Sequence, residues 1–528
     1  MNYKVCILAA GIGGRMNELS AYINKAILPV NFKATISYIV EKFPEDIEII
    51  IAVGHRKETI IDYLSLAHPE RKFTYVEIDK YVGPGTGPGY SLLKCRDYLK
   101  CPFVFSTSDT MVIEDIPLPD RNWFGIAPVK ETEPYCTVKI KNNLICQLDD
   151  KIKTNNKFAF IGLAGVYDYE DFFLALERNK DIISGEIQVS NGFKKLIEKQ
   201  LVPNGFTWFD TGTSENYTET DKNFSGNDKK FDFSKGNEFI YFVNNRVIKF
   251  FADENIAKNR CQRAEKYLKG LCPDIEKQKG SFYSYQKVNG HTLYSVLNAK
   301  IARDFFIWAK SNLWQERNLS SDQKDRFYSA CHKFYHDKTM RRIKLFFDKT
   351  GVEDVANNIN GIPVPPLKEL LDKVDWENIS RGIPSNFHGD LQFDNILINQ
   401  NASDSRNKFV LLDWRQDFGG LIDTGDLYYD LAKLYGGMIL SYQLIKEGMF
   451  SFDMGNTDVY YNFFTKYNLS EAKEEYELFL KQHNFDLKRI KLITSIIFLN
   501  MAPLHNNPFN LLLHYLGRSL LYRSLQNN

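Results

Sequence analysis

The sequence lacks the patterns that mark several classes of protein. Its eight cysteines are scattered along 528 residues, and none of them forms a C-x-x-C pair. This argues against a zinc site and a disulfide framework and fits a reducing cytosol. No apolar run reaches about 18 residues, so we expect no membrane span. A strand-like run begins directly after Lys4, so we expect no signal peptide. The prediction is a cytoplasmic protein.

An excess of either charge is also absent. The net charge is +1 with 25% charged residues, so neither nucleic acid nor an anionic membrane surface is expected as a partner. The hydrophobic content of 44% is that of a soluble globular protein, and the length predicts about two to four domains. Small molecules are the expected partners, and the sequence predicts no particular oligomeric state.

Two common nucleotide-binding motifs are missing. No Walker A string occurs, and no G-x-G-x-x-G fingerprint is followed by an acid about 20 residues later. The chain has instead a glycine-rich turn, Leu8 to Met16, directly after the apolar run Val5 to Leu8. Glycines let the backbone approach a ligand closely. The exposed amides of such a turn can hold phosphate oxygens, and Arg15 can neutralise them.

This turn resembles the opening signature of the sugar-phosphate and alcohol-phosphate nucleotidyltransferases. That signature is L-A-A-G-x-G-x-R-M followed by a lysine ahead of Leu-Pro, and the chain has Lys25 ahead of Leu28-Pro29. The resemblance implies a nucleoside triphosphate site in which Arg15 and Lys25 act in catalysis. The residues that it implies as nucleotide contacts are Leu8, Ala10, Gly11, Gly13, Gly14, Arg15 and Lys25.

The first half of the chain alternates strand-like and helix-like runs. Apolar runs at 47–53, 73–78 and 103–106 alternate with helical spacing at 57–66 and 90–99. This alternation predicts an α/β domain with a doubly wound, mostly parallel sheet. Ligands bind at the carboxyl ends of the strands in such a sheet, where we expect the glycine-rich turn and Asp109.

Two aspartates are the candidate metal ligands of this domain. Nucleotidyl transfer needs a divalent metal, and Mg²⁺ prefers carboxylate oxygens and water. Asp109 follows the strand-like run 103–106, and Asp210 lies in Trp208-Phe209-Asp210-Thr211-Gly212-Thr213. The latter resembles the W-x-D-x-G-T segment of the same family, in which the two aspartates hold the metal together. Either aspartate alone could equally belong to a turn or a cap.

A second glycine-rich segment, Gly83 to Leu92, resembles the family's loop beside the nucleobase. We assign nucleotide contacts to Gly85, Thr86 and Gly87. The loop carries two extra prolines, so the choice of base stays open, and a rigid turn without a ligand is the alternative. On the acceptor side, Ser184-Gly185-Glu186-Ile187 resembles the family's G-E segment, which implies a substrate role for Glu186. Lys151, or else Lys153, is the candidate lysine for the acceptor phosphate.

The polar stretch 214–237 predicts a linker. We place a domain boundary near residue 230, with a nucleotidyltransferase domain at 1–230 and a second domain at 231–528. The second domain begins with a small β-rich lobe at about 237–290, which includes a hairpin around Asn244-Asn245. Helical patterns then predict a larger lobe at about 291–528.

The strongest motif of the second half is His388-Gly389-Asp390 followed by Asn395. Four residues separate Asp390 from Asn395, as in the catalytic loop of kinases. In that loop the aspartate orients the attacking hydroxyl and accepts its proton, while the asparagine reaches a metal. Asp413 ends the apolar run 410–412, where the metal-binding aspartate of protein kinases would stand.

Together with 425–432, this set resembles the aminoglycoside phosphotransferases and choline kinases. The resemblance implies a two-lobed α+β fold, ATP as donor and Mg²⁺ held by Asn395 and Asp413, with Asp390 as the catalytic residue. Lys249 is the expected phosphate contact, Glu265 is our candidate for its ion-pair partner, and Asp430 is expected to brace the catalytic loop. The glycine-rich loop of protein kinases is missing, which favours a small-molecule kinase.

Two catalytic domains in one chain predict a bifunctional enzyme. The kinase would phosphorylate a small alcohol, and the nucleotidyltransferase would activate the phosphate ester. We expect choline, ethanolamine or a relative, activated with CTP for decorating a surface polysaccharide such as a capsule or lipopolysaccharide. The alternatives are an anomeric sugar kinase feeding an NDP-sugar pyrophosphorylase, and one active domain beside a degenerate binding module. A set of aromatic and acidic residues would favour a cationic head group by cation–π contact, although such aromatics are more often core: Trp414, Asp417, Asp423, Tyr428 and Tyr429.

Overall fold

The computed structural model describes residues 2–179, 181–225, 236–399, 402 and 404–526. Contacts divide these residues into two compact units, which we describe separately. The first unit contains the described residues up to 225 together with 236–254 and 279–284, and the second contains 255–278 and 285 onward. The predicted small lobe at 237–290 is therefore divided between the two units.

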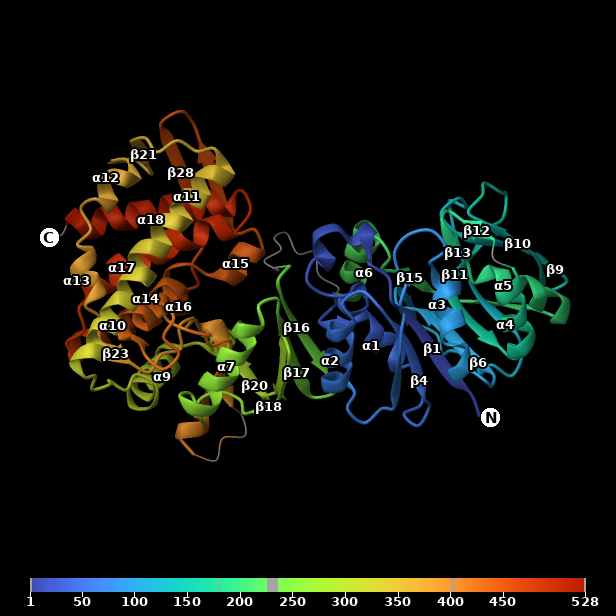
Figure 1. The fold of residues 1–528 in the computed structure, drawn as a ribbon. Helices are drawn as coiled ribbons and strands as arrows, with labels where there is room; N and C mark the ends of the chain where they lie inside the picture. Colours follow the sequence, from blue (N-terminus) through green and yellow to red (C-terminus); the bar gives the residue numbers. More distant parts are fainter. Residues whose placement is uncertain (1, 180, 226–235, 400–401, 403, 527–528) are drawn as a thin grey trace. The chain divides into compact units, whose positions relative to one another are not determined.

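The first unit is built on a mixed sheet with the strand order β10-β9-β11-β6-β1-β4-β5, and β8 and β14 lie off this path (Figure 1). Strands β5, β4, β1 and β6 are parallel, as we predicted. Strand β11 is antiparallel to β6, β8 and β9, so the sheet as a whole is mixed and not mostly parallel. The strands of this sheet are β1 (Lys4–Ala9), β4 (Ile49–Val53), β5 (Phe73–Glu77), β6 (Phe103–Thr107), β8 (Trp123–Pro128), β9 (Cys136–Lys141), β10 (Leu144–Asp150), β11 (Phe158–Val166) and β14 (Val202–Gly205).

The antiparallel part follows from short connections. Asn142 and Asn143 join β9 directly to β10, and both have positive φ, which asparagine in a tight hairpin tolerates. A two-residue link leaves no room for the crossover helix that a parallel pair needs. Shorter strands of the unit are β2 (Pro29–Val30), β3 (Lys33–Ala34), β7 (Thr110–Val112), β12 (Ile182–Ile183), β13 (Glu186–Ile187) and β15 (Trp208–Asp210).

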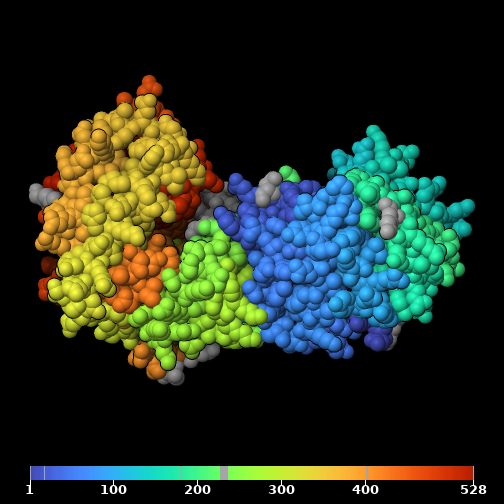
Figure 2. Space-filling view, viewed as in Figure 1, coloured from blue at the N-terminus to red at the C-terminus, as the bar shows by residue number. Residues whose placement is uncertain are grey.

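Both faces of the sheet are buried, because residues of β1 alternate between two cores. Val5, Ile7 and Ala9 belong to one apolar cluster, whereas Cys6 and Leu8 belong to the other. Helices α1 and α2 pack on the first face, and α3, α4 and α5 on the second. In Figure 2 the blue and teal parts of this unit form one continuous surface. The helices are α1 (Thr35–Val40), α2 (Lys57–Ala67), α3 (Pro88–Lys94), α4 (Tyr169–Arg178), α5 (Ser190–Leu196) and α6 (Ser214–Ser225), with 3₁₀ turns η1 (Gly14–Ser20), η2 (Lys25–Ile27), η3 (Arg96–Tyr98) and η4 (Ile197–Lys199).

Two segments differ from the sequence-based expectation. The first part of the predicted linker forms helix α6, whose Asn216 and Thr220 side chains donate to Asp210; residues 226–235 lie outside the described residues. The hairpin of β16 (Glu238–Val243) and β17 (Arg246–Phe251) joins the core of the first unit, although we placed it in the second domain. Its Tyr241 is fully buried against Tyr63, which explains this grouping. Strand β19 (Phe282–Gln286) begins in the same unit.

The second unit is mainly helical around one large apolar core. A three-stranded sheet, β20-β24-β25, carries the predicted catalytic segment, and a short pair, β23 with β26, leads into α14. No helix among the residues described is long and apolar enough to cross a membrane. The strands are β18 (Ile275–Lys279), β20 (Gly290–Thr292), β21 (Asn357–Ile359), β22 (Ile362–Val364), β23 (Pro384–Ser385), β24 (Ile396–Asn399), β25 (Phe409–Leu411), β26 (Gly425–Asp426), β27 (Phe450–Met454) and β28 (Asp458–Phe463). The helices are α7 (Glu254–Lys266), α8 (Leu293–Val296), α9 (Ala299–Asn312), α10 (Ser321–His332), the π-helix η5 (Lys333–Asp337), α11 (Lys338–Thr350), α12 (Leu367–Leu371), α13 (Trp376–Ser380), η6 (Phe393–Asn395), η7 (Arg406–Lys408), α14 (Leu427–Ile439), α15 (Tyr442–Lys446), α16 (Tyr467–Gln482), α17 (Leu487–Met501), η8 (Ala502–Leu504) and α18 (Phe509–Gln526).

Candidate functional site

A cavity of about 560 Å³ lies in the first unit, where β1 and β6 end. Its walls come from the glycine-rich turn, the loop before α3, the end of β6 and the β12–β13 turn. Most predicted nucleotide contacts line it, whereas Gly85, Lys151 and Asp210 do not. The predicted residues in its wall are Leu8, Ala10, Gly11, Gly13, Gly14, Arg15, Lys25, Thr86, Gly87, Asp109 and Glu186.

The turn after β1 is fixed by Gly13 and Met16. Gly13 has a φ of 67°, and a side chain there would meet Lys25 Cβ at 3.3 Å, so glycine suits both the backbone and the space. The Met16 amide donates to the Gly13 carbonyl at 2.8 Å, and the Met16 side chain is fully buried. A side chain at Gly11 would meet nothing within 4 Å. The buried Met16 side chain thus anchors the turn in the core, while the glycines at 11 and 13 line the cavity.

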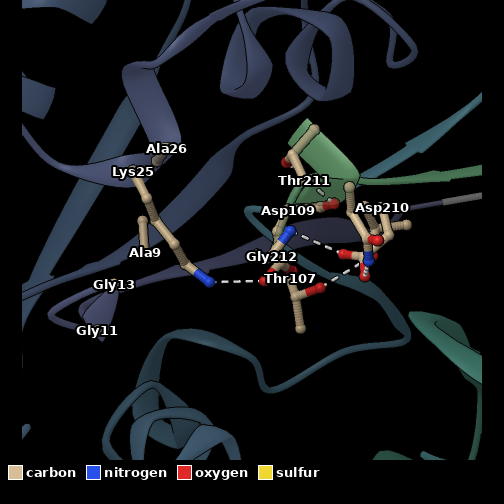
Figure 3. Close-up of polar contacts among 12 residues, drawn as sticks. Ala9, Gly11, Gly13, Lys25, Ala26, Thr107, Asp109, Asp210, Thr211 and Gly212 are labelled. Carbon is tan, nitrogen blue, oxygen red and sulfur yellow. Dashed lines mark hydrogen bonds and ion pairs between the residues drawn. The ribbon is translucent and has the colours of Figure 1, made fainter. Parts of the chain in front are cut away.

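Asn24, which sequence reasoning missed, sets the position of Lys25. Its buried Nδ2 donates to the carbonyl oxygens of Ala9 at 3.1 Å and His55 at 2.8 Å, and its Oδ1 accepts from the Ala26 amide. These bonds tie η2 to the ends of β1 and β4. They hold the Lys25 side chain over the cavity (Figure 3).

Lys25 and Asp109 form an ion pair, with 2.6 Å between Nζ and Oδ2 (Figure 3). Burial raises the pKa of the Asp109 carboxyl, but the adjacent Lys25 ammonium, together with Thr107 and Arg15, outweighs burial, and the pKa falls to about 2. Asp109 is therefore ionised at neutral pH. The sequence predicted both residues for this site but not their direct contact.

Asp210 reaches the same place from strand β15, which pairs with β7 so that Asp210 lies opposite Thr110. Its Oδ1 accepts from the Gly212 amide at 2.8 Å, and its Oδ2 accepts from Asn216 Nδ2 at 2.6 Å. Burial, and then the nearby negative Asp109, raise the pKa of Asp210. The carboxylates are thus neighbours although they lie far apart in the sequence.

Gly212 marks the point on which these charges converge. A methyl group there would lie 2.9 Å from Asp210 Oδ1, 3.2 Å from Asp109 Oδ2 and 3.6 Å from Arg15 Nη2. Two half-buried carboxylates facing one point repel each other, and a small divalent cation relieves this repulsion. Oxygen ligands of this kind suit Mg²⁺, so the residues present fit the predicted metal.

The loop before α3 is attached to the β12–β13 turn. The Gly85 amide donates to the Gly185 carbonyl at 2.9 Å, and the Ile187 amide donates to the Thr86 carbonyl at 2.7 Å. Gly87 has a φ of 111°, and a side chain there would lie 2.7 Å from Glu186 Cβ. The loop and the turn therefore form one wall of the cavity, to which Tyr81 and Ser184, missed from the sequence, also contribute.

The two predicted acceptor-side residues contact each other. Lys151 Nζ lies 3.5 Å from Glu186 Oε2, and Gln188 Nε2 donates to the same oxygen at 3.1 Å. Glu186 lines the cavity, so this pair lies at its rim. The arrangement offers an ammonium group beside the cavity, held in place by a carboxylate.

In the second unit, Asp430 braces the predicted catalytic loop, as we expected. Its carboxylate accepts from the amides of His388 at 2.6 Å and Gly389 at 2.7 Å. Burial raises the pKa of Asp430 to about 6, against these two hydrogen bonds, which lower it. His388 Nε2 contacts the Leu412 carbonyl at 2.7 Å, which joins the loop to the segment after β25.

The same geometry brings Asn395 and Asp413 together. Asn395 Nδ2 donates to the Asp390 carbonyl at 2.9 Å, and the Leu412 amide donates to the Asn395 carbonyl at 2.8 Å. Asp413 follows directly, with a φ of 56° and its Oδ1 3.6 Å from Arg260 Nη1. A carboxylate oxygen and an amide oxygen are both ligands that Mg²⁺ accepts, and this backbone hydrogen bond brings the two residues near each other.

Arg263 is a second residue that sequence reasoning missed. It is fully buried on α7, and it donates to the carbonyl oxygens of Phe387, Arg415 and Ile422. Its guanidinium lies 3.7 Å from the centre of the Phe387 ring. Burial lowers the pKa of Arg263 to about 9. Because Phe387 and Arg415 flank the predicted catalytic segment, Arg263 holds that segment in place.

Lys249 and Glu265 behave differently from the remaining predicted residues. Lys249 is buried on β17, which belongs to the first unit. Its pairing with Glu265, which belongs to the second unit, stays a prediction. Glu265 itself is exposed on α7. The reason lies in the face of α7 that packs inward, which carries Ala257, Cys261 and Ala264.

The aromatic and acidic residues that we considered for a cationic head group serve other purposes. Trp414 is fully buried. Arg489 already lies 4.6 Å from the Tyr428 ring, and Tyr429 packs against Phe334. Asp423 pairs with Arg317 at 3.2 Å, and Asp417 accepts from the Gly420 amide. These residues are core and loop structure, and they form no open cage.

Comparison with known proteins gives relatives for the N-terminal region. No family model matches the chain. A stretch of 220 residues is 30% identical to the bifunctional protein GlmU of Methanococcus vannielii and covers 39% of this chain and 51% of that protein. A stretch of 227 residues is 30% identical to GlmU of Methanocaldococcus jannaschii, over 41% and 53% of the two chains. The chain thus spans about half the length of the curated relatives it matches.

Solved structures also align with part of the chain. UDP-glucose pyrophosphorylase complexed with UDP-glucose aligns with a TM-score of 0.37 and 21% identity, over 43% of this chain and 99% of that one. CTP:phosphocholine cytidylyltransferase from Streptococcus pneumoniae (LicC) aligns with a TM-score of 0.35 and 18% identity, over 42% and 99%. The N-terminal region resembles GlmU and the nucleotidyltransferases in sequence.

Proposed function

We propose that the first unit transfers a nucleotidyl group from a nucleoside triphosphate to a phosphate ester. The observation that carries this proposal is the convergence of Asp109, Asp210 and Arg15 on one point of a cavity walled by the glycine-rich turn. Backbone amides of such a turn, with Arg15 and Lys25, suit the binding of a triphosphate. The sequence similarity of the N-terminal region to GlmU supports the same class of reaction.

The chemistry follows from these positions. An oxygen of the acceptor phosphate attacks the α-phosphorus, the bond to the bridging oxygen of the β-phosphate breaks, and pyrophosphate leaves. Lys25 and Arg15 bind and orient the phosphates, and Lys151 at the rim would bind the acceptor phosphate. Mg²⁺, held by Asp109 and Asp210, would neutralise charge on the triphosphate and align it.

We further propose that the second unit transfers a phosphoryl group from ATP to the hydroxyl of a small molecule. Asp390 orients that hydroxyl and takes its proton, while Asn395 and Asp413 would hold Mg²⁺ on the phosphates. Support comes from the spacing of the motif and from Asp430, which fixes the loop through two amides. Lys249 remains our candidate for a phosphate contact, and a nucleotide-binding role for Glu265 has no support from its exposed position.

Together these activities define a bifunctional enzyme in which the kinase product is the nucleotidyl acceptor. The sequence resemblance to choline kinases favours CTP and an amino alcohol, giving a CDP conjugate for surface polysaccharide decoration. The alternative is an anomeric sugar kinase with an NDP-sugar pyrophosphorylase, which the same cavity residues would serve. A third possibility is that one unit is a non-catalytic binding module.

A pyrophosphate-release screen tests the nucleotidyl transfer. Each of the four nucleoside triphosphates is offered with phosphocholine, phosphoethanolamine, other phosphorylated alcohols and sugar 1-phosphates. We expect release with one base and one acceptor class, and loss of release in Asp109→Asn and Asp210→Asn. Asp390→Asn is the matched control, which should release pyrophosphate at the wild-type rate. Release that survives Asp109→Asn would refute the proposed site.

A further inference from the structure

Four basic side chains lie close to one another near Asp390, the candidate catalytic residue of the second unit. Lys433 on α14 is 8% exposed, and its Nζ lies 3.0 Å from Asp390 Oδ1. The stem of Arg415 packs against the residue before Asp390, because a side chain at Gly389 would meet Arg415 Cδ at 3.2 Å. Lys338 and Arg342, one turn apart on α11, complete the group.

A shared aromatic ring brings Lys338 and Arg415 together. Lys338 Nζ lies 3.9 Å from the centre of the Phe334 ring, and the Arg415 guanidinium lies 5.1 Å from the same centre. Lys338 is also 5.9 Å from the ring of Tyr429. Cations on an aromatic face gain modest energy from the ring, but the ring does not neutralise them.

These cations lack carboxylate partners. Among the residues that the structure describes, Lys338, Arg342 and Arg415 form no ion pair, and the one carboxylate paired with the group is Asp390, through Lys433. Arg342 Nη1 is buried and has no hydrogen-bond partner among the residues that the structure describes. Burial, and then the neighbouring Arg415, Arg342 and Lys433, lower the pKa of Lys338 well below its ordinary value. Several positive charges held together, partly out of water, are costly unless an anion joins them.

We propose that the alcohol substrate of the second unit, whose hydroxyl Asp390 orients, is an anion. Its carboxylate, phosphate or phosphonate group is bound by Lys338, Arg342 and Arg415. Arginine forks and ammonium groups are the usual partners of such groups, whereas choline or ethanolamine would bring a further positive charge to the cluster. The inference rests on the proposed phosphotransferase function, and it replaces the amino alcohol that the sequence resemblance favours with an anionic alcohol. The substrate hydroxyl attacks the γ-phosphorus of ATP, the bond to the bridging oxygen of the β-phosphate breaks, ADP leaves, and the hydroxyl proton passes to Asp390.

Alcohols matched in length test this substrate class. ADP formation is measured with 3-hydroxypropanoate, 2-hydroxyethylphosphonate, 1,3-propanediol and 3-aminopropanol. We expect turnover with one or both anions, and the two anionic probes separate carboxylate from phosphonate specificity. Arg342→Gln should raise KM for the anion about 30-fold with little change in kcat, as expected for one lost charged hydrogen bond. Arg341→Gln, at the exposed neighbouring position, is the matched control and should leave KM unchanged.

A binding measurement keeps the proposal testable if none of these alcohols is turned over. Hydrogen exchange of the α11 backbone in the full chain is followed with each of the four probes. Protection by an anion, absent in Arg342→Gln and absent with 3-aminopropanol, supports the proposal. Preferred binding or turnover of 3-aminopropanol or the diol overturns it, as does the absence of protection by either anion. The proposed phosphotransferase itself is judged separately, by whether ATP hydrolysis without an acceptor is lost in Asp390→Asn.

Discussion

The ion pair between Lys25 and Asp109 offers a quantitative test of the first site. The 2.6 Å contact holds the pKa of Asp109 at about 2, against an ordinary value of 3.8, although burial alone would raise it. That difference corresponds to about 2 kcal/mol of stabilisation at neutral pH. That net shift combines the cost of burial with the stabilisation by Lys25 and smaller effects of Thr107 and Arg15, so we expect a coupling free energy on the order of 2 kcal/mol between Lys25 and Asp109.

The assay is a double-mutant cycle of Lys25→Met, Asp109→Asn and the double variant. Hydrogen exchange in peptides covering β1 and β6 gives the free energy of opening of the first unit alone. The exposed pair Arg96–Glu177 of the same unit, with 2.9 Å between Nη1 and Oε2, is the control, and its coupling should stay below about 0.5 kcal/mol. Each single variant should lower the free energy of opening by more than half as much as the double variant, because it leaves one half-buried charge unpaired.

The stabilisation that Asp109 contributes decreases as the pH falls. Because the pKa of Asp109 is lower in the folded state, the stabilisation is fully present above about pH 3.8 and is lost as the pH falls from there towards 2. Additive effects of Lys25→Met and Asp109→Asn at neutral pH would refute this reasoning. So would a coupling in the exposed control pair as large as that of Lys25 and Asp109.

Three further predictions concern single residues. Asp390→Asn should lower ADP formation at least about 1,000-fold while pyrophosphate release continues unchanged, and parallel loss of both rates would show that the sites are not independent. Gly212→Ala should reduce pyrophosphate release, because the methyl group would press on Asp210; Gly205→Ala, where a side chain meets nothing within 4 Å, is the control and should not. Asp430→Asn should destabilise the second unit by about 1–3 kcal/mol, because a carboxylate oxygen is lost from a buried amide; unchanged hydrogen exchange in β24 and α14 would contradict this.

The sequence predicted the parts of the fold that local patterns encode. The turn from Leu8 to Met16 and the parallel strands follow from hydrophobic runs and glycines a few residues apart. Asp109 and Asp210 were predicted as a pair only because their motifs resemble one family. Helix α6 was mistaken for a linker, since most of its residues are polar and only Tyr217 and Phe224 pack inward as apolar side chains. Its Asn216 donates a hydrogen bond to Asp210.

Residues that act through distant backbone groups were beyond prediction. Asn24 and Arg263 each bind carbonyl oxygens far away in sequence, and a single polar residue carries no pattern of its own. The basic group around Asp390 is assembled from α11, the segment after β25 and α14, so only the folded chain reveals it. Glu265 is different, because the inward positions of Cys261 and Ala264 on α7 already indicate that their neighbour faces solvent.

The fate of the γ-phosphate of ATP tests the central claim most directly. The full chain is given ATP labelled in that phosphate, an alcohol that it phosphorylates and all four nucleoside triphosphates. We predict that the label moves through the phosphate ester into a nucleoside diphosphate conjugate. Asp109→Asn should stop at the labelled ester, and Asp390→Asn should make conjugate only from a supplied ester. A labelled ester that accumulates in the wild-type reaction and is never converted would contradict the account.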